Sequence, residues 1–208
     1  MSDLSGCQLC PRLAAHCAAV KLCYPDYHCA PVAAFGAPNA RLLIVGLAPG
    51  LHGANASGRP FTGDASGDLL FAALHEHGFA SQAQSRSSTD GMRLIDCRLT
   101  NAVKCLPPNN QPRLAEIITC NRFLQDEIGY LPAGGTLLTL GGIAHRAVTR
   151  ALGLRNAEYP FARAAVYGLD GQRTLFSSYH PSRYNLNTGR ISAASFAAVF
   201  ARIRELLR

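Results

Sequence analysis

The fold is decided by the stretch RLLIVGLAPGLHGANASGRPFTGD, residues 41–64. Residues 41–45 combine a short apolar run with β-branched side chains, which predicts a buried strand. The loop after this strand is rich in Gly and Pro, and Gly lets a backbone come close to a flat or anionic ligand because it has no side chain. The loop also carries polar and aromatic side chains that would converge on one small volume: His52, Asn55, Arg59, Phe61 and Asp64.

A second loop of the same character lies far along the chain, with the sequence SYHPSRYN at residues 178–185. It carries a histidine directly before a proline, at the end of a predicted strand that covers residues 173–179. The two loops together suggest a site that grips a planar base.

Predicted strands and helices alternate along the rest of the chain. Two further strands are expected at about 92–97 and 136–140. Helices are expected at 11–20, from Asp64 or Ser66 to His77, from Pro112 to Ile128, up to Leu152 after Gly141-Gly142, and at 191–207. We expect residues 22–40 to form a loop and residues 80–90 to form an exposed excursion.

This alternation predicts an α/β fold, a single domain over residues 1–208 with three α/β/α layers around a central four-stranded, mainly parallel sheet. In such sheets, ligands bind beyond the carboxyl ends of the strands. The loops at 46–64, 101–111, 141–142 and 180–190 all follow predicted strands. We therefore expect these four distant segments to meet at one site.

The composition is that of an ordinary globular protein with a basic surface. Of the 208 residues, 48% are hydrophobic and 16% are charged, with a net charge of +7 and a pI near 9.2. This charge favours a polyanionic partner such as nucleic acid, although a basic protein without such a partner fits it too. No apolar run is long enough for a membrane span, and the N-terminus lacks the pattern of a signal peptide, so we expect a cytoplasmic protein.

Four of the eight cysteines form a candidate metal site. Cys7 and Cys10 make a C-x2-C pair, and Cys105 and Cys120 lie in the middle of the chain, separated by 14 residues. Four thiolates fit either zinc or an iron–sulfur cluster. One close pair with two dispersed cysteines favours a cluster over a zinc ribbon, which would repeat C-x2-C. The alternative is that Cys105 and Cys120 are buried as small hydrophobic residues.

Several side chains near the predicted site have two interpretations each. Asp64 is a candidate helix cap that is also placed to orient a water. Phe61 is either part of the core or a stacking platform for a base. Asn101 and Asn110 are candidates for reading a base edge, because an amide both donates and accepts, but Asn also forms turns. His180 is either satisfied by backbone or functional at the strand end.

Together these residues resemble the uracil-DNA glycosylase superfamily, and in particular its family 5, the iron–sulfur glycosylases. Residues 46–64 are similar to the first motif of that family and residues 179–190 to its last motif. The four cysteines fall where the 4Fe–4S ligands of the family fall. Leu47 favours family 5, since family 4 has an acidic residue there, whereas Asn101 resembles the base-reading Asn of family 4.

The resemblance implies a monofunctional DNA glycosylase that flips uracil out of double-stranded DNA and hydrolyses its glycosidic bond, leaving an abasic site. Hypoxanthine and other damaged bases are implied as further substrates. The implied catalytic residues are Asp64 and Asn110, which would act on the sugar and the water, and His180, which would donate to uracil O2. The implied base-binding residues are Gly46, Leu47, Gly50, Phe61 and Asn101.

The resemblance also implies contacts to DNA and a role for the cluster. Arg183 and Tyr184 would enter the duplex. The remaining implied DNA contacts are His52, Arg59, Lys104, Ser182 and Arg190. The 4Fe–4S cluster would be structural and would join the N-terminal segment to the 105–120 region of a monomer.

Two other functions remain open at the level of the sequence. One is an α/β hydrolase that uses the 46–64 loop for nucleotide phosphates, although the loop lacks the lysine of a P-loop. The other is a non-enzymatic iron–sulfur protein that binds DNA.

Overall fold

The computed structural model describes residues 4–170 and 172–208, and its centre is a six-stranded sheet with the order β1-β3-β2-β4-β6-β5. The strands are β1 (Phe35–Gly36), β2 (Leu42–Gly46), β3 (Cys97–Asn101), β4 (Thr136–Leu140), β5 (Val166–Gly168) and β6 (Thr174–Ser178). The four inner strands are parallel, and the two edge strands pair antiparallel with them. The predicted parallel sheet is thus confirmed in its inner four strands.

Two details of the predicted sheet are wrong. The sheet has six strands instead of four, because β1 and β5 have two and three residues and are too short to leave a periodic pattern in the sequence. The strand predicted at 92–97 is β3 at Cys97–Asn101 instead, and all five of its residues are buried. Its polar residues Arg98, Thr100 and Asn101 made this stretch look like a loop.

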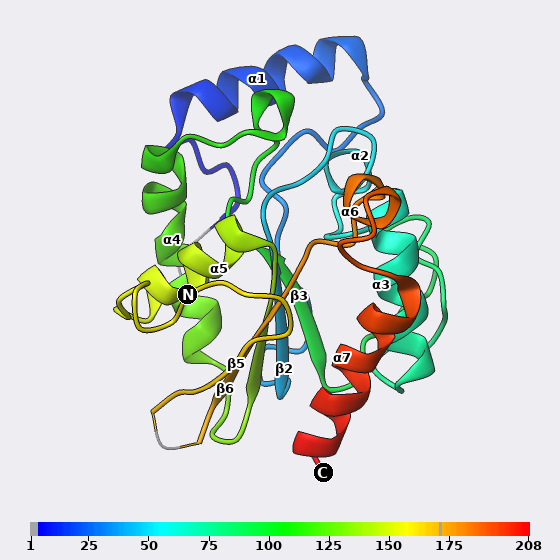
Figure 1. Cartoon of the computed structure of the whole chain (residues 1–208). Coiled ribbons are helices and arrows are strands. Elements are labelled where there is room, and N and C mark those ends of the chain that lie inside the picture. The colour runs from blue at the N-terminus through cyan, green and yellow to red at the C-terminus, as the bar shows by residue number, and fades with distance from the viewer. Residues whose placement is uncertain (1–3, 171) are drawn as a thin grey trace.

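Helices cover both faces of the sheet, as Figure 1 shows, so the predicted three layers are confirmed. The α-helices are α1 (Pro11–Cys23), α2 (Ala54–Ser57), α3 (Ala65–Glu76), α4 (Leu114–Gly129), α5 (Gly142–Ala151), α6 (Arg183–Asn187) and α7 (Ala193–Leu206). Helices α3 and α7 lie on one side of the sheet and α4 and α5 on the other, while α1 crosses above its carboxyl edge. The sequence did not predict the short helices α2 and α6.

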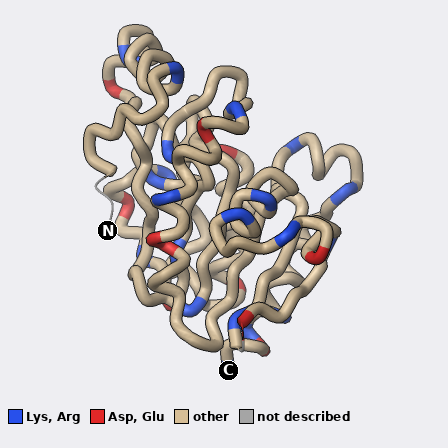
Figure 2. Tube along the Cα trace, turned by 90° about the vertical axis from the view of Figure 1, so that its left-hand side faces the viewer, with Lys and Arg blue, Asp and Glu red and all other residues tan. Residues whose placement is uncertain are grey.

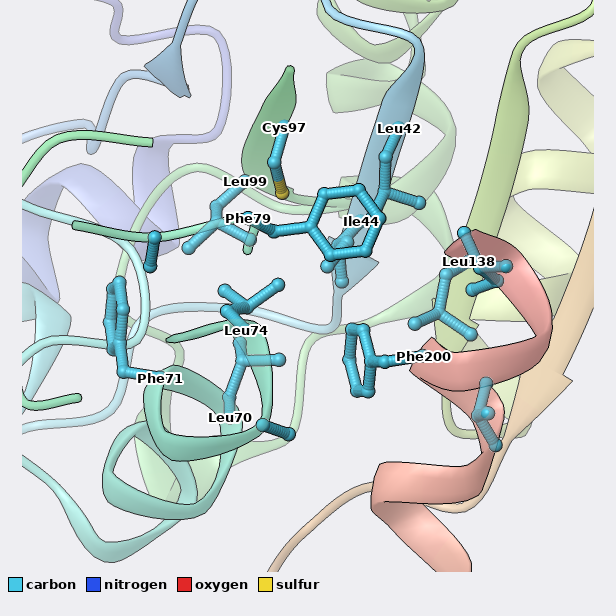
Figure 3. Packing of buried hydrophobic residues seen from close by; sticks show 14 of the residues in the cluster. Leu42, Ile44, Leu70, Phe71, Leu74, Phe79, Cys97, Leu99, Leu138 and Phe200 are labelled. Carbon is cyan, nitrogen blue, oxygen red and sulfur yellow. The ribbon is translucent and has the colours of Figure 1, made fainter. Parts of the chain in front are cut away.

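The two faces of β2 supply two separate cores, because successive side chains of a strand point in opposite directions. Leu42 and Ile44 pack with residues of α3 and α7, and Figure 3 shows this cluster. Leu43 and Val45 pack with residues of α4 and α5. The central strand is therefore buried on both faces, which explains its continuous apolar run.

The helix after the 46–64 loop begins as predicted. Asp64 is the N-cap of α3, and its Oδ1 accepts a hydrogen bond of 2.9 Å from the backbone N–H of Gly67. The excursion at 80–90 is less exposed than predicted, because Ser85 is buried against the 46–64 loop. Across the described part of the chain, no helix has the length and apolar character needed to span a membrane.

Candidate functional site

The four predicted loops meet at the carboxyl edge of the inner strands. There they enclose a cavity of about 420 Å³, which we call the base pocket. Each loop contributes lining residues: Gly50 and Asp64, Asn101 and Asn110, Gly141 and Gly142, and His180 and Ser182. The expected convergence of these segments is confirmed.

Asp64 presents a carboxylate that is fixed on two sides. Its Oδ1 accepts the capping hydrogen bond from α3. Its Oδ2 lies so close to Gly53 that a Cβ on that glycine would be 2.4 Å from it. Only glycine fits at this position, and the carboxylate is held at the wall of the base pocket. Asp64 is thus both the helix cap and a pocket residue, and the two interpretations do not compete.

Phe61 is 6% exposed and has a φ of 57°, a conformation that is rare for a bulky residue. The bare backbones of two glycines accommodate it. A Cβ on Gly46 would be 2.5 Å from the Phe61 ring, and a Cβ on Gly67 would be 1.8 Å from the Phe61 carbonyl oxygen. The ring faces that of His180, with centroids 6.4 Å apart and planes 27° from parallel. One face of the base pocket is therefore aromatic.

His180 lines the base pocket at the end of β6. Burial lowers the pKa of its imidazole below the usual 6.5, and the nearby negative charge of Asp64 opposes this effect. The loop around it is fixed, because the His180 carbonyl oxygen accepts hydrogen bonds from the Asn185 side chain (2.9 Å) and from the Ser182 backbone (2.8 Å). At pH 7 the site therefore holds a neutral imidazole as a hydrogen-bond donor.

The two asparagines occupy different depths of the pocket. Asn101 ends β3 and is 4% exposed, and a Cβ on Gly46 would be 2.5 Å from its Oδ1. Within the described part of the chain its amide has no hydrogen-bond partner, so it is free for a ligand. Asn110 ends the 3₁₀ turn η1 (Pro108–Asn110) with a φ of 56° and is exposed at the rim.

Exposed side chains suited to contacting DNA gather beside the pocket on helix α6 and the segment after it. Ser182 is the N-cap of α6, and Arg183 and Tyr184 begin the helix. Tyr184 is 62% exposed, and the Arg190 guanidinium lies 5.3 Å from its ring centroid. His52 is also exposed, on the 46–64 loop.

Two predicted phosphate contacts are wrong, because both cations are buried in ion pairs. Arg59 is 6% exposed and pairs with Asp90 at 2.7 Å. Lys104 is 1% exposed and pairs with Glu127 at 2.7 Å. The sequence positions of Arg59 and Lys104 near the site loops did not indicate in which direction their side chains point. The remaining basic residues are spread over many elements, as Figure 2 shows.

The four predicted cysteines line a second, narrow hollow with apolar walls, which we call the cysteine hollow. Burial raises the pKa of the Cys120 thiol to about 11, and the backbone N–H and the charge of Lys104 oppose this effect. The Lys104 backbone N–H donates to Cys120 Sγ at 3.3 Å. In the described part of the chain no three ligand side chains close around a single metal ion.

The sequence missed one cysteine in this region. Cys17, on α1, interacts with Cys105, and the hydrogen bond between them lowers the pKa of the Cys17 thiol. Cys17 is buried seven residues after Cys10, a spacing that places both on one face of a helix. That helical spacing was the signal that could have revealed it.

Comparisons with known proteins agree with this arrangement. The family model for the uracil DNA glycosylase superfamily matches residues 33–204. The chain is 44% identical over 211 residues to a type-5 uracil-DNA glycosylase of Thermus thermophilus, covering 99% of this chain and 96% of that protein.

Two further relatives come from Pyrobaculum aerophilum. Its type-5 uracil-DNA glycosylase is 39% identical, covering 97% of this chain and 89% of that protein. Its type-4 uracil-DNA glycosylase is 34% identical over 145 residues, covering 68% of this chain and 66% of that protein. The type-5 match thus extends over nearly the whole chain, and the chain belongs to the uracil-DNA glycosylase superfamily, within its type-5 family.

Proposed function

We propose that this protein is a DNA-repair glycosylase that removes uracil from double-stranded DNA by hydrolysis and leaves an abasic site. The observation that carries the proposal is the base pocket, where a fixed carboxylate, a neutral imidazole, an aromatic ring and an unpaired amide face one cavity. Its volume of about 420 Å³ is in the range of small-molecule pockets and admits one base.

The base would leave the duplex and enter this pocket. Flipping costs a few kcal/mol and costs least for a mispaired base, which favours uracil opposite guanine. Stacking on Phe61 contributes roughly 1–3 kcal/mol by analogy with other base–aromatic contacts. The free Asn101 amide both donates and accepts, as the edge of uracil requires. The backbone at Gly46, Leu47 and Gly50 would complete the wall.

Bond cleavage would then develop negative charge on the base and positive charge on the sugar. The neutral His180 would donate a hydrogen bond to uracil O2, and losing one such donor typically costs about 10²–10³ in rate. The Asp64 carboxylate would stabilise the sugar cation and position a water, with Asn110 assisting from the rim. The water adds to C1′ of the deoxyribose, and the base leaves with the bonding electrons and takes up a proton.

The surface beside the pocket would hold the DNA. Arg183 and Tyr184 project from the first turn of α6 and would enter the gap left by the flipped base. His52, Ser182 and Arg190 would contact phosphates, which makes binding dependent on salt. The protein would act as a monomer and a single domain.

Four residues would hold a 4Fe–4S cluster: Cys7, Cys10, Cys105 and Cys120. Their chemistry fits, because each iron of such a cluster takes one thiolate, so the four sulfurs need not surround a single ion. The apolar walls of the cysteine hollow and the N–H donated to Cys120 Sγ are typical of the protein groups that tune such clusters. When bound, the cluster would supply a cross-link between the N-terminal segment and the 105–120 region, since hydrolysis needs no electron transfer.

Uracil need not be the only base removed. Leu47 gives the pocket an apolar wall where an acidic side chain would restrict the choice of base. We therefore include hypoxanthine and other deaminated bases among the proposed substrates.

The test is base release from end-labelled duplexes that contain U opposite G, hypoxanthine opposite T, or only normal bases, followed by alkali. We expect cleavage of the damaged strands, abolished in Asp64→Ala and reduced about 10²–10³-fold in His180→Ala. Asp68→Ala and His75→Ala are matched controls, because both residues are exposed on α3 and should retain full activity.

Two outcomes would contradict the proposal. Iron-loaded protein that binds these duplexes without releasing any base would indicate a DNA-binding protein. Hydrolysis of free nucleotides without base release would indicate the nucleotide hydrolase.

A further inference from the structure

A third hollow lies across the 46–64 loop from the base pocket. This hollow, the flanking groove, has a volume of about 480 Å³ and is lined by three segments, residues 26–28, parts of 52–63 and residues 86–88. The two hollows share one wall, since Asp64 lines the base pocket and its neighbour Gly63 lines the flanking groove. The two hollows therefore meet the 46–64 loop at adjacent residues.

Aromatic rings form one end of the groove. Tyr24 and Tyr27 are stacked with their centroids 4.7 Å apart, and the edge of the His52 ring meets both at 5.6 and 6.0 Å. The hydroxyl of Tyr27 lies 3.0 Å from His52 Nδ1. This bond orients the imidazole and leaves Nε2 as its free nitrogen. Tyr24 is 37% exposed and Tyr27 is half-buried, so part of this aromatic cluster is accessible to solvent.

The opposite side of the groove carries Arg86, which forms no ion pair with any residue that the structure describes. Arg86 is exposed, and its guanidinium bonds to the neutral side-chain oxygen of Gln84 at 2.6 and 3.1 Å. The nearby carboxylate of Asp90 is instead bound to Arg59 and to the backbone N–H of Arg86. Ser87 and Ser88 add hydroxyl groups to the same wall.

The remaining charged and titratable groups of the groove are few. Of the lining residues, Asp26 alone is acidic, and His28 lies beside it with its Nε2 bonded to the Pro31 carbonyl oxygen at 3.3 Å. Lys21 borders the turn and donates to the Tyr27 carbonyl oxygen. The groove thus combines one free guanidinium, an oriented imidazole, hydroxyls and stacked rings, which together suit a sugar–phosphate backbone.

We propose that the flanking groove binds the backbone of the uracil-containing strand next to the flipped nucleotide, with Arg86 and His52 on its phosphates. This inference rests on the proposed glycosylase function and names the path of the strand beyond the base. Gly63 is exposed with a φ of 89° and has no side chain to block the strand between the two hollows. Tyr27 acts as a positioning residue for His52.

The test compares DNA binding with base release in Arg86→Ala. Binding to a fluorescein-labelled U:G duplex is measured by anisotropy between low and moderate KCl concentrations in a background that cannot cleave, Asp64→Ala. We expect roughly fivefold weaker binding at low salt and a salt slope that is smaller by about 0.9, the value for one lost phosphate contact. With Asp64 intact and protein below saturation, base release should slow by about the same factor as binding weakens.

Three companion variants separate binding from folding. Asp26→Asn should tighten binding, a change opposite in sign to that of Arg86→Ala, which damage to the fold would not produce. Arg86→Lys should restore much of the affinity. Arg150→Ala, an exposed arginine at the far end of α5, is the matched control and should bind as the parent does.

The length of the DNA gives an independent check. When the duplex is shortened on the side of the uracil that occupies the groove, parent and Arg86→Ala should bind it equally well. The side on which shortening has this effect identifies the strand direction in the groove. Equal binding by parent, Arg86→Ala and Asp26→Asn, or an effect that persists whichever side is shortened, would overturn the groove assignment while base release continues. Absence of base release by the parent protein would instead overturn the proposed function.

Discussion

Two hollows flank the carboxyl end of β3, and they are built in opposite ways. The base pocket is lined in part by Asn101, the last residue of the strand; it is wide, and several polar side chains line it among largely apolar walls. The cysteine hollow is lined in part by residues 103–105, which follow the end of β3, and it is narrow and mainly apolar apart from its thiols. One hollow suits a ligand that enters and leaves, and the other suits a group that stays.

Each hollow is supported by one buried ion pair. The guanidinium of Arg59 braces the 46–64 loop by bonding to Asp90 at 2.7 Å and to the carbonyl oxygen of Ser88 at 2.7 Å. The ammonium of Lys104 joins Thr100 on β3 to Glu127 on α4 at 2.5 and 2.7 Å. These two charges near the functional site thus stabilise the scaffold, whereas Arg183 on α6 and Arg190 after it are exposed and available to a partner.

The largest effect is expected from removing one of the proposed cysteine ligands. In Cys120→Ser we expect loss of the brown colour and of visible absorption, and a fall in the melting temperature of about 10 °C or more, or failure to fold. The reason is that bound metal groups contribute directly to folding free energy. Exposed Cys23→Ser is the control and should keep both properties. An iron-free Cys120→Ser protein of unchanged stability would sink the structural role of the cluster.

The buried pair behind the cysteine hollow is the next target. Lys104→Met should lower the free energy of unfolding by about 3–5 kcal/mol, because it leaves the Glu127 carboxylate buried without its partner. The double variant Lys104→Met, Glu127→Leu should recover most of this loss. Urea denaturation of the parent, Lys104→Met and the double variant measures these differences in unfolding free energy. Equal stability of all three proteins would show that the two charges are not coupled.

Variants of the two asparagines test how the base lies in the base pocket. Asn101→Ala should raise the barrier for uracil release by roughly 1–3 kcal/mol, the value typical of an amide that reads a base edge. Asn110→Ala should lower the rate of base release at saturating DNA for both uracil and hypoxanthine, because the proposed place of Asn110 is at the sugar and not at the base. If both variants keep parental rates on both substrates, the proposed placement of the base is incorrect.

The pH dependence of stability reports on the buried imidazole of the base pocket. The folded-state pKa of His180 is depressed by burial, so its stabilising effect is fully present above the unfolded value near 6.5 and is lost as pH falls below it. In that window one proton gives a slope of at most about 1.4 kcal/mol per pH unit. Urea titrations between pH 5 and 7.5 should show a smaller slope in His180→Gln.

Part of the slope should remain in that variant, since burial also lowers the pKa of His145. An identical slope in parent and His180→Gln would contradict the neutral imidazole at the site.

The smallest effect is expected for an exposed side chain on the surface beside the base pocket. Arg190→Ala should reduce the salt slope of DNA binding by about 0.9 and leave protein stability unchanged, because the side chain is exposed and its one described contact is the ring of Tyr184. Anisotropy titrations at several KCl concentrations measure this. An unchanged slope would remove Arg190 from the phosphate contacts.

Much of the fold followed from local patterns. The run at 41–45 and the alternation of strands and helices predicted the parallel core, and the cap at Asp64 was correctly placed. Strand β3 was misplaced, because its polar residues are buried only through contacts with distant segments. For example, the Arg98 guanidinium donates to the carbonyl oxygen of Gly36, 62 residues earlier in the chain.

The sequence by itself determined the family, the set of loops at the site and the four candidate cluster ligands, since these depend on residue types at fixed spacing. Only the tertiary structure decided which side chains face the ligand. It buried Arg59 against Asp90 and Lys104 against Glu127, and it set Asn101 deep and Asn110 at the rim. The direction of a long or polar side chain is decided by partners far away in the sequence, and local patterns carry no record of those partners.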